Sequence, residues 1–165
     1  FLKAKVKNGQ SGSVIYVTSS TKGEGKTFVS ANLASVYAAT GKKTLIIGTD
    51  LRNPQLHNLF NLDKNASGLT NYLSKQDFTV DDLTYKNITG NNLDVILSGP
   101  IPPNPSELLD DHKFEELLDQ LKENYDYIIV DTAPTIHVSD TLLISHLSDI
   151  FLYLVRAEFT DIKLL

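Results

Sequence analysis

The sequence contains no cysteine, no apolar run close to the length of a membrane span, and no signal pattern at its N-terminus. Without cysteine, neither a disulfide framework nor a thiolate metal site can form, which fits a reducing compartment. The apolar runs fall short of the roughly 20 residues that cross a bilayer. We therefore expect a cytoplasmic location and no membrane-spanning segment in these residues.

Basic residues are also few, and they form no block. The chain has 15 lysines and arginines against 20 aspartates and glutamates, which gives a net charge of −5. A protein that binds nucleic acid through its phosphates usually carries a clustered positive patch. The charge pattern therefore predicts no nucleic-acid partner.

The 165 residues, 41% of them hydrophobic and 21% charged, suit one globular domain over residues 1–165. The chain begins at Phe1 rather than at a methionine, and it stops at Leu165, where "TDIKLL" begins to resemble a helix. We therefore expect a fragment of a longer chain, truncated at the C-terminus.

Apolar runs rich in β-branched residues alternate with helical patterns along the chain. The expected strands are 13–18, 43–48, 93–99, 125–131 and 149–155. The clearest helices are 27–41 and 112–124, with shorter ones near 54–60, 68–73 and 140–147. Most of the strands are continuously apolar, as in a sheet covered on both faces. The pattern predicts an α/β fold with an open, mainly parallel sheet and helices on both faces.

The stretch "TSSTKGEGKT", residues 18–27, joins the first expected strand to the first expected helix. Gly23 and Gly25 permit the positive φ angles that aim successive N–H groups at one point, and the helix after them adds its dipole. Lys26 would neutralise phosphate oxygens and the Thr27 hydroxyl would bind Mg²⁺. Ser20 stands where the common phosphate-loop pattern has glycine, so a turn that only caps the helix is the alternative.

Two aspartates follow buried strands at the same expected edge of the sheet. Asp131 ends the run "YIIV" and Asp50 follows "TLIIGT". Ligands of open α/β folds bind at the carboxyl ends of the strands, so both carboxylates are candidates for a Mg²⁺ site. The alternative for each is a helix or turn cap.

Two further basic residues have two interpretations each. Lys22 is either a second cation on the phosphates, which could reach across a dimer, or a solvated lysine. Arg52 is either a positioning group beside the ligand or part of a surface ion pair.

The segment "SGPIPPNPSELL", residues 98–109, carries four prolines within six positions. Prolines remove backbone donors and hold an extended path, so we expect a rigid surface loop. Ser106 would then cap a short helix with its hydroxyl.

Four segments together make the chain resemble the cytoplasmic domain of bacterial tyrosine kinases, which belong to the P-loop NTPase superfamily and regulate capsule and exopolysaccharide export. These are the phosphate loop "SSTKGEGKT", the second acidic motif "LIIGTDLRNP", the strand "IIVDTAP" and the proline-rich segment. The last is the most specific, because other P-loop ATPases have no reason to carry it.

The resemblance implies an autokinase that moves the γ-phosphoryl of ATP, with Mg²⁺, to tyrosines of a C-terminal tail of a neighbouring subunit. It implies self-association as a ring or dimer, and an inner-membrane polysaccharide co-polymerase as partner or attached domain. The residues expected to bind the nucleotide are Ser20, Thr21, Lys22, Gly23, Glu24, Gly25, Lys26, Thr27 and Phe28. Those expected to take part in catalysis are Lys22, Lys26, Asp50 and Arg52, and those expected to hold the metal are Thr27, Asp50 and Asp131.

The chain departs from the family pattern at two places. Gly48 occupies the first acidic position of the second motif, so Asp50 would serve alone if a base is needed. The tyrosine-rich tail is absent, and the acceptor is expected beyond Leu165. Two alternatives remain. "KGEGKT" is similar to the loop of septum-site and chromosome-partitioning ATPases, which act as dimerising switches, and Gly48 allows a nucleotide-binding scaffold without kinase activity.

Overall fold

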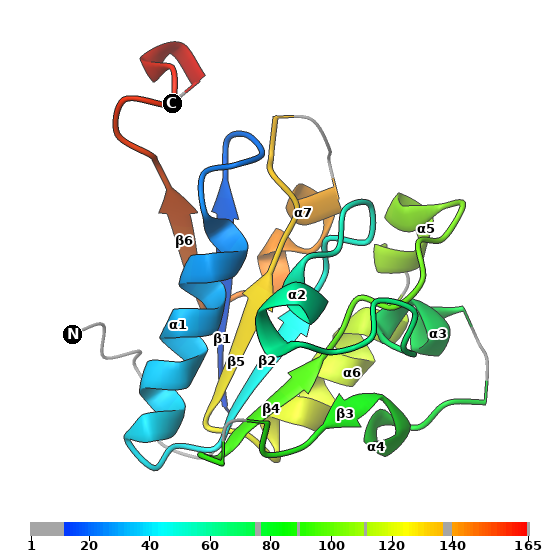
Figure 1. Cartoon of the computed structure of the whole chain (residues 1–165). Coiled ribbons are helices and arrows are strands. Elements are labelled where there is room, and N and C mark those ends of the chain that lie inside the picture. Colours follow the sequence, from blue (N-terminus) through cyan, green and yellow to red (C-terminus); the bar gives the residue numbers. More distant parts are fainter. Residues whose placement is uncertain (1–11, 75–76, 89, 111, 137–139, 165) are drawn as a thin grey trace.

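The computed structural model describes residues 12–74, 77–88, 90–110, 112–136 and 140–164, and these residues form one six-stranded sheet with helices on both faces (Figure 1). The strands are β1 (Ser13–Ser19), β2 (Thr44–Gly48), β3 (Thr84–Tyr85), β4 (Leu93–Ile96), β5 (Tyr127–Asp131) and β6 (Ile150–Leu154). Their order across the sheet is β3-β4-β2-β5-β1-β6. All neighbours are parallel except β3 and β4, which confirms the expected α/β class.

The helices lie between the strands along the chain, and all but the one at Val80–Leu83 fall where the sequence predicts a helix. They are α1 (Lys26–Ala39), α2 (Leu56–Phe60), α3 (Leu69–Leu73), α4 (Val80–Leu83), α5 (Pro105–Leu109), α6 (His112–Lys122) and α7 (Asp140–Leu143), with short 3₁₀ turns at Ser145–Leu147 and Ile162–Leu164. None of the helices in the described ranges is long and apolar enough to cross a membrane. The helix expected at 140–147 is shorter in the structure, because α7 ends at Leu143 and a 3₁₀ turn follows at Ser145–Leu147.

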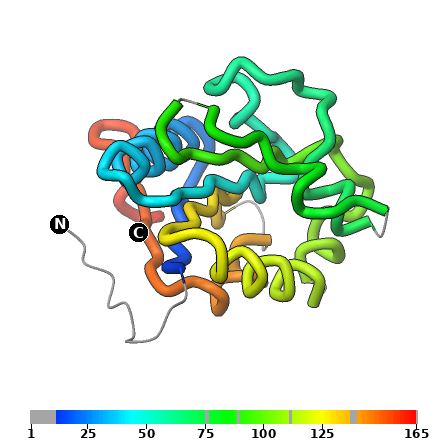
Figure 2. Tube along the Cα trace, turned by 90° about the horizontal axis from the view of Figure 1, so that it is seen from below, coloured from blue at the N-terminus to red at the C-terminus, as the bar shows by residue number. Residues whose placement is uncertain are grey.

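Two apolar cores lie on opposite faces of the sheet. One packs α3, α5 and α6 against β1, β2 and β5, and is centred on Tyr16 and Phe114. The other packs α1 against Ile15, Ile46 and Ile129, which are the alternate residues of the same strands. Figure 2 shows α1 and α6 on the two sides of the sheet. Strands covered in this way bury nearly every residue, as the continuous apolar runs predict, and only Tyr127 of β5 is half-buried.

The last strand is an exception to that pattern. β6 lies at the edge of the sheet and alternates half-buried with exposed residues, among them Phe151 and Tyr153. Its run "IFLYL" is as apolar as those of the inner strands. Hydrophobic content therefore identifies it as a strand, but the position of β6 in the sheet sets its exposure.

Candidate nucleotide-binding site

Three strands carry the predicted site residues to one edge of the sheet. β5 lies between β1 and β2, and Asp131, its last residue, is level with Val17 on one side and Gly48 on the other. The N–H of Thr49 donates to the carbonyl oxygen of Asp131 at 2.8 Å. The loop after β1 and the loop after β2 consequently begin next to each other, with Asp131 between them (Figure 1).

The loop between β1 and α1 has the backbone of an anion cradle. Gly23 and Gly25 have φ angles of 88° and 96°, a region that side chains other than glycine rarely adopt. Gly25 precedes the first residue of α1, and no side chain caps the N–H groups of this 14-residue helix. The first N–H groups of a helix need an acceptor, and a phosphate supplies one. This geometry supports the cradle over a turn in which a side chain caps the helix.

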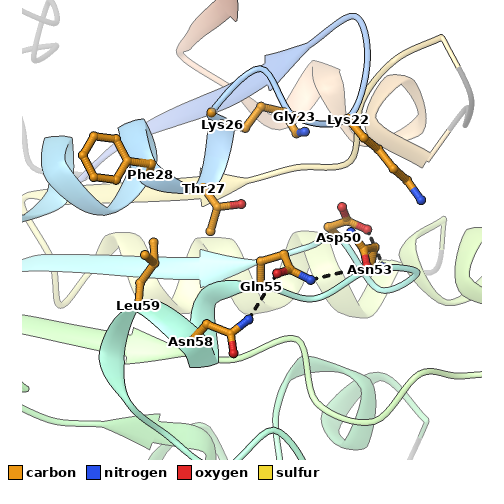
Figure 3. Close-up of a pocket in the computed structure, with 11 residues that line it drawn as sticks. Lys22, Gly23, Lys26, Thr27, Phe28, Asp50, Asn53, Gln55, Asn58 and Leu59 are labelled. Carbon is orange, nitrogen blue, oxygen red and sulfur yellow. Dashed lines mark hydrogen bonds between the residues drawn. The ribbon is translucent and has the colours of Figure 1, made fainter.

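A cleft of about 370 Å³ opens between this loop, the start of α1 and the segment after β2 (Figure 3). It is lined by Lys22, Gly23, Gly25, Lys26, Thr27, Phe28, Asp50, Asn53, Gln55, Asn58 and Leu59. The structure therefore brings seven of the predicted site residues to one cavity.

Lys26 and Asp131 are both buried beside the cleft, but only Lys26 is among the residues that line it. Lys26 is only 7% exposed and Asp131 only 3%. Ser30 donates to Asp131 Oδ1 at 3.2 Å. Burial raises the pKa of Asp131 to about 7, although hydrogen bonds from Thr27 and Ser30 and the charge of Lys26 lower it. A carboxylate held in this way gains from a divalent cation, which would offset the cost of burying its charge.

The described residues contain no group of three histidine, aspartate or glutamate side chains that could hold a metal by itself. The Thr27 hydroxyl and the carboxylates of Asp50 and Asp131 instead offer a few oxygen ligands, and Mg²⁺ is usually bound by such a small number of protein oxygens together with the phosphates of a substrate. Asp50 lines the cleft, and its proximity adds to the rise in the pKa of Asp131. These residues fit a nucleotide with Mg²⁺.

Ser20, Thr21 and Glu24 belong to the loop but do not line the cleft. Ser20 is buried, and its hydroxyl is 2.8 Å from the hydroxyl of Tyr153 on β6. This contact explains a serine where the common pattern has glycine. Glu24 accepts the N–H of Thr21 at 2.7 Å. The side chains of Ser20 and Glu24 hold the loop, and the N–H of Thr21 is engaged by Glu24. The structure therefore does not bring these three predicted residues to the cleft.

Arg52 lies outside the cleft lining and pairs with a buried carboxylate. Its Nε donates to Asp140 Oδ2 at 2.7 Å and its Nη2 to Asp140 Oδ1 at 3.2 Å. Burial opposes ionisation of Asp140, but hydrogen bonds from Arg52 and Ser106 outweigh it and hold the pKa of Asp140 below its ordinary value. Arg52 thereby ties the segment after Asp50 to α7, as a positioning group would.

The expected helix cap at Ser106 is wrong. The helix begins at Pro105, Asn104 precedes it, and no side chain caps it. The Ser106 hydroxyl instead donates to Asp140 Oδ1 at 2.6 Å and accepts from Arg52 Nη2 at 2.9 Å. Pro102 and Pro105 are also buried, so the proline-rich segment is packed against the domain and is only partly a surface loop.

Four cleft residues escape prediction from the sequence, namely Asn53, Gln55, Asn58 and Leu59. The three amides form a chain of hydrogen bonds: Asn58 Nδ2 donates to Gln55 Oε1 at 3.1 Å and Gln55 Nε2 to Asn53 Oδ1 at 3.3 Å. The N–H of Asn53 donates to Asp50 Oδ1 at 2.9 Å. The proximity of these residues to Asp50 in sequence is the only signal that could have indicated them.

Gly48 occupies a confined position at the end of β2. A Cβ placed there would lie 2.6 Å from Ser98 Oγ and 3.1 Å from Leu56 Cδ1. Gly48→Asp is therefore expected to lower the free energy of unfolding by about 1–3 kcal/mol, the usual cost of overpacking. Denaturant unfolding measures this change.

Ser98→Ala removes the hydroxyl that an aspartate at position 48 would meet. Added to Gly48→Asp, it should recover at least half of the lost stability, whereas strictly additive effects would contradict the packing argument. The double variant also tests whether an acidic residue at position 48 is needed as the base. The yield of phosphotyrosine should rise if the absence of this residue limits the reaction, and an unchanged yield would show that no such base is needed.

The fold and the cleft together define a P-loop nucleotide-binding protein, with a phosphate loop after β1 and acidic residues after β2 and β5. Residues 12–160 match the sequence profile of a family described as an AAA domain. Because relatives named as tyrosine-protein kinases are 39–42% identical over 82–88% of this chain, and a solved kinase domain matches 98% of it, the chain belongs to the bacterial tyrosine kinases of this superfamily.

Named relatives support that assignment. The chain is 42% identical to the tyrosine-protein kinase YwqD of Bacillus subtilis over 82% of this chain and 56% of YwqD. It is 39% identical to a Klebsiella pneumoniae protein named as a tyrosine-protein kinase in the cps region, over 88% of this chain and 20% of that protein. The VpsO kinase domain superposes with a TM-score of 0.88 at 35% identity, covering 98% of this chain and 77% of that domain. The chain thus spans about half of YwqD and a fifth of the Klebsiella protein.

A more distant structural neighbour is the cell division ATPase MinD of Pyrococcus furiosus, with a TM-score of 0.72 and 26% identity over 87% of this chain and 59% of MinD. The lower similarity makes the ATPase switches the secondary comparison, behind the tyrosine kinases.

Proposed function

We propose that this domain transfers the γ-phosphoryl group of ATP to tyrosines of a polypeptide, with Mg²⁺ as cofactor. The observation that carries the proposal is the division of one cleft into two chemically different parts. The part formed by the loop offers glycine N–H groups and the cations Lys22 and Lys26, which suit phosphates. The part formed by the segment after β2 offers three neutral amides and the apolar side chain of Leu59, which suit a peptide.

The residues would act through position and charge. The loop N–H groups and Lys26 would bind the phosphates, and Thr27, Asp50 and Asp131 would hold Mg²⁺, which neutralises charge on the transferred group. The tyrosine oxygen forms a bond to the γ-phosphorus as the bond to the β,γ-bridging oxygen breaks, and ADP leaves. Asp50, at the junction of the two parts of the cleft, would accept the phenol proton. Lys22 would add a second positive charge at the same end, and Arg52 would position the Asp50 segment through Asp140.

Two apolar side chains support an aromatic acceptor. Phe28 on α1 is 64% exposed and Leu59 on α2 is 47% exposed, and they lie together at the end of the cleft away from Lys22 (Figure 3). A tyrosine-bearing segment laid over the amides would cover both. The dimerising ATPase switch needs no such acceptor surface.

Leu59→Ala tests the acceptor surface. Losing about half of a leucine contact costs about 1 kcal/mol, so the KM for a tyrosine peptide added in trans should rise about fivefold. The KM for ATP should stay within about twofold. Val36→Ala is the matched control, because Val36 is a similarly exposed aliphatic residue of α1 outside the cleft lining. An unchanged peptide KM would remove the acceptor from this surface.

We also propose that the full-length protein carries its acceptor tyrosines in a C-terminal tail, phosphorylates them between subunits of a ring or dimer, and acts at the inner membrane beside a polysaccharide co-polymerase. The Klebsiella relative named for the cps region supports the link to capsule.

One assay separates the three candidate functions. The full-length protein is incubated with ATP and Mg²⁺, then blotted for phosphotyrosine while phosphate release is measured. Labelled tyrosine supports the kinase. Phosphate release without labelled tyrosine favours the ATPase switch, and nucleotide binding with neither product favours the scaffold.

A further inference from the structure

The phosphate loop contains a glutamate, although its expected ligand is an anion. Glu24 does not repel that ligand at close range, because its side chain is buried and does not line the cleft. Its Oε2 accepts the N–H of Thr21 at 2.7 Å, and its Oε1 accepts the hydroxyl of Thr160. Burial disfavours the charge, but the hydrogen bonds and the nearby Lys26 outweigh it and hold the pKa of Glu24 below its ordinary value.

Thr160 belongs to residues 156–160, which follow β6 and which we call the strap. The strap passes beside the loop between β1 and α1 at the top of Figure 1. Arg156 donates from Nη1 to the carbonyl oxygen of Gly23 at 2.8 Å. The ring of Phe159 lies 3.4 Å from where a Cβ of Gly23 would be, and Arg156 stacks over that ring at 4.9 Å.

The strap is itself closed by the same hydroxyl that contacts Glu24. The N–H of Arg156 donates to Thr160 Oγ1 at 3.0 Å, and the N–H of Thr160 donates to the carbonyl oxygen of Arg156 at 2.9 Å. One chain of hydrogen bonds therefore runs from Arg156 N–H through the Thr160 hydroxyl and the Glu24 carboxylate to Thr21 N–H.

This arrangement fixes the direction of the loop peptides. A loop that binds phosphate must keep its N–H groups turned toward the ligand and its carbonyl oxygens turned away. Arg156 holds the carbonyl of Gly23 on the side of the strap. Glu24 holds the N–H of Thr21 away from the cleft, so this second contact fixes the shape of the loop and does not aim an N–H group at the phosphates. Two of the loop's peptide groups are thus fixed without a nucleotide, which lowers the ordering cost of binding.

We infer that Arg156 and Thr160 are positioning residues of the phosphate loop, acting through Gly23 and Glu24, and that they raise the affinity of the domain for nucleoside di- and triphosphates. The inference rests on the nucleotide-binding part of the proposed function and on no property of the acceptor.

Thr160→Val tests the inference, because valine keeps the shape of threonine and removes its hydroxyl. It removes the donor to Glu24 Oε1 and leaves only the N–H of Thr21 on Oε2, and we expect the dissociation constant for Mg²⁺-ADP, measured by calorimetry, to rise about tenfold. Thr160→Ser should restore affinity to within about twofold of the wild type. Thr40→Val is the matched control, since the Thr40 hydroxyl donates to Tyr37 O at the far end of α1.

Further measurements distinguish positioning from general stabilisation. Amide exchange at Thr21 should quicken in Thr160→Val, and the KM for ATP should rise while kcat stays within about twofold. Arg156→Ala, at an exposed residue, should weaken ADP binding at least threefold and gives an independent test if the valine variant does not fold. Wild-type affinity in both variants would overturn the inference. Wild-type protein that binds no nucleotide would instead overturn the proposed function.

Discussion

Lys26→Ala is expected to lower phosphotyrosine formation by at least about a hundredfold. Lys26 is the first residue of α1, it lines the cleft, and it is only 7% exposed. A cation in such a place needs no reorganisation to neutralise charge that develops on a phosphoryl group, and removing one preorganised stabilising group of this kind typically costs two to three orders of magnitude. Nucleotide affinity should fall as well, because Lys26 would also bind the phosphates of ATP before the phosphoryl group is transferred.

Loss of Lys26 acts on the protein without ligand too. Its charge lowers the pKa values of Asp131 and Glu24, so the alanine variant leaves both carboxylates less compensated. The measurement is therefore made at matched folded fractions, verified by thermal unfolding. Lys86→Ala is the control, because Lys86 is an exposed lysine paired with Asp81 beside β3. Activity within threefold of the wild type would refute the assignment of the phosphate site.

The parts of the site that follow local rules could be predicted from the sequence. Continuous apolar runs identify the parallel strands, so the residues that follow them, Asp50 and Asp131, fall at one edge of the sheet. Glycines at positions 23 and 25 followed by "KT" then identify the cradle. Each prediction needs only the neighbouring residues in the chain and the geometry of a parallel sheet.

The parts that depend on distant partners could not. Ser106 fits the local rule for a helix cap, but its hydroxyl bonds to Arg52, 54 residues earlier, and to Asp140, 34 residues later. A buried carboxylate and a guanidinium are stronger partners than the N–H groups of a five-residue helix. Gly48 is a second example. Its neighbours in the sequence suggest that an acidic residue is missing, whereas in the structure Ser98, in the loop after β4, occupies the space that a side chain at position 48 would need.

The cleft wall and the strap show the same limit. Asn53, Gln55 and Asn58 are ordinary polar residues in the sequence, and only the turn after Asp50 aligns them into a chain of hydrogen bonds. Thr160 lies 136 residues from Glu24, and nothing in either segment indicates the other. The contact between Thr160 and Glu24 forms because the order of strands in the sheet places β6 beside β1, and the sequence of either segment does not predict that order.

Asp131→Asn is expected to have opposite effects on the free and the ligand-bound protein. Burial raises the pKa of Asp131 to about 7, whereas an exposed aspartate titrates near 4. Between these values the folded state binds a proton that the unfolded state does not. The stability contributed by this group therefore falls as pH rises from about 4 through 7, and above pH 7 the full cost of a buried charge remains.

Asparagine carries no charge and can still accept from Ser30. Without nucleotide and metal, the variant should be more stable than the wild type at pH 8 by at least about 1 kcal/mol, or about 2–4 °C in Tm, and the difference should shrink toward pH 5. With Mg²⁺-ATP the order should reverse, because the wild type gains stabilisation through the carboxylate and the variant does not.

Thermal unfolding at pH 5 and pH 8, with and without Mg²⁺-ATP, gives all four values needed for this comparison. Asp81→Asn serves as the control, since Asp81 is exposed and lies beside β3. If the Asp131 variant bound Mg²⁺-ATP as tightly as the wild type and kept its activity, the carboxylate would not be a metal ligand. If its free form were equally destabilised at both pH values, burial of the charge would not set the pKa. The two outcomes are independent, because one depends on the cation and the other only on the cost of dehydrating a carboxylate at the end of β5.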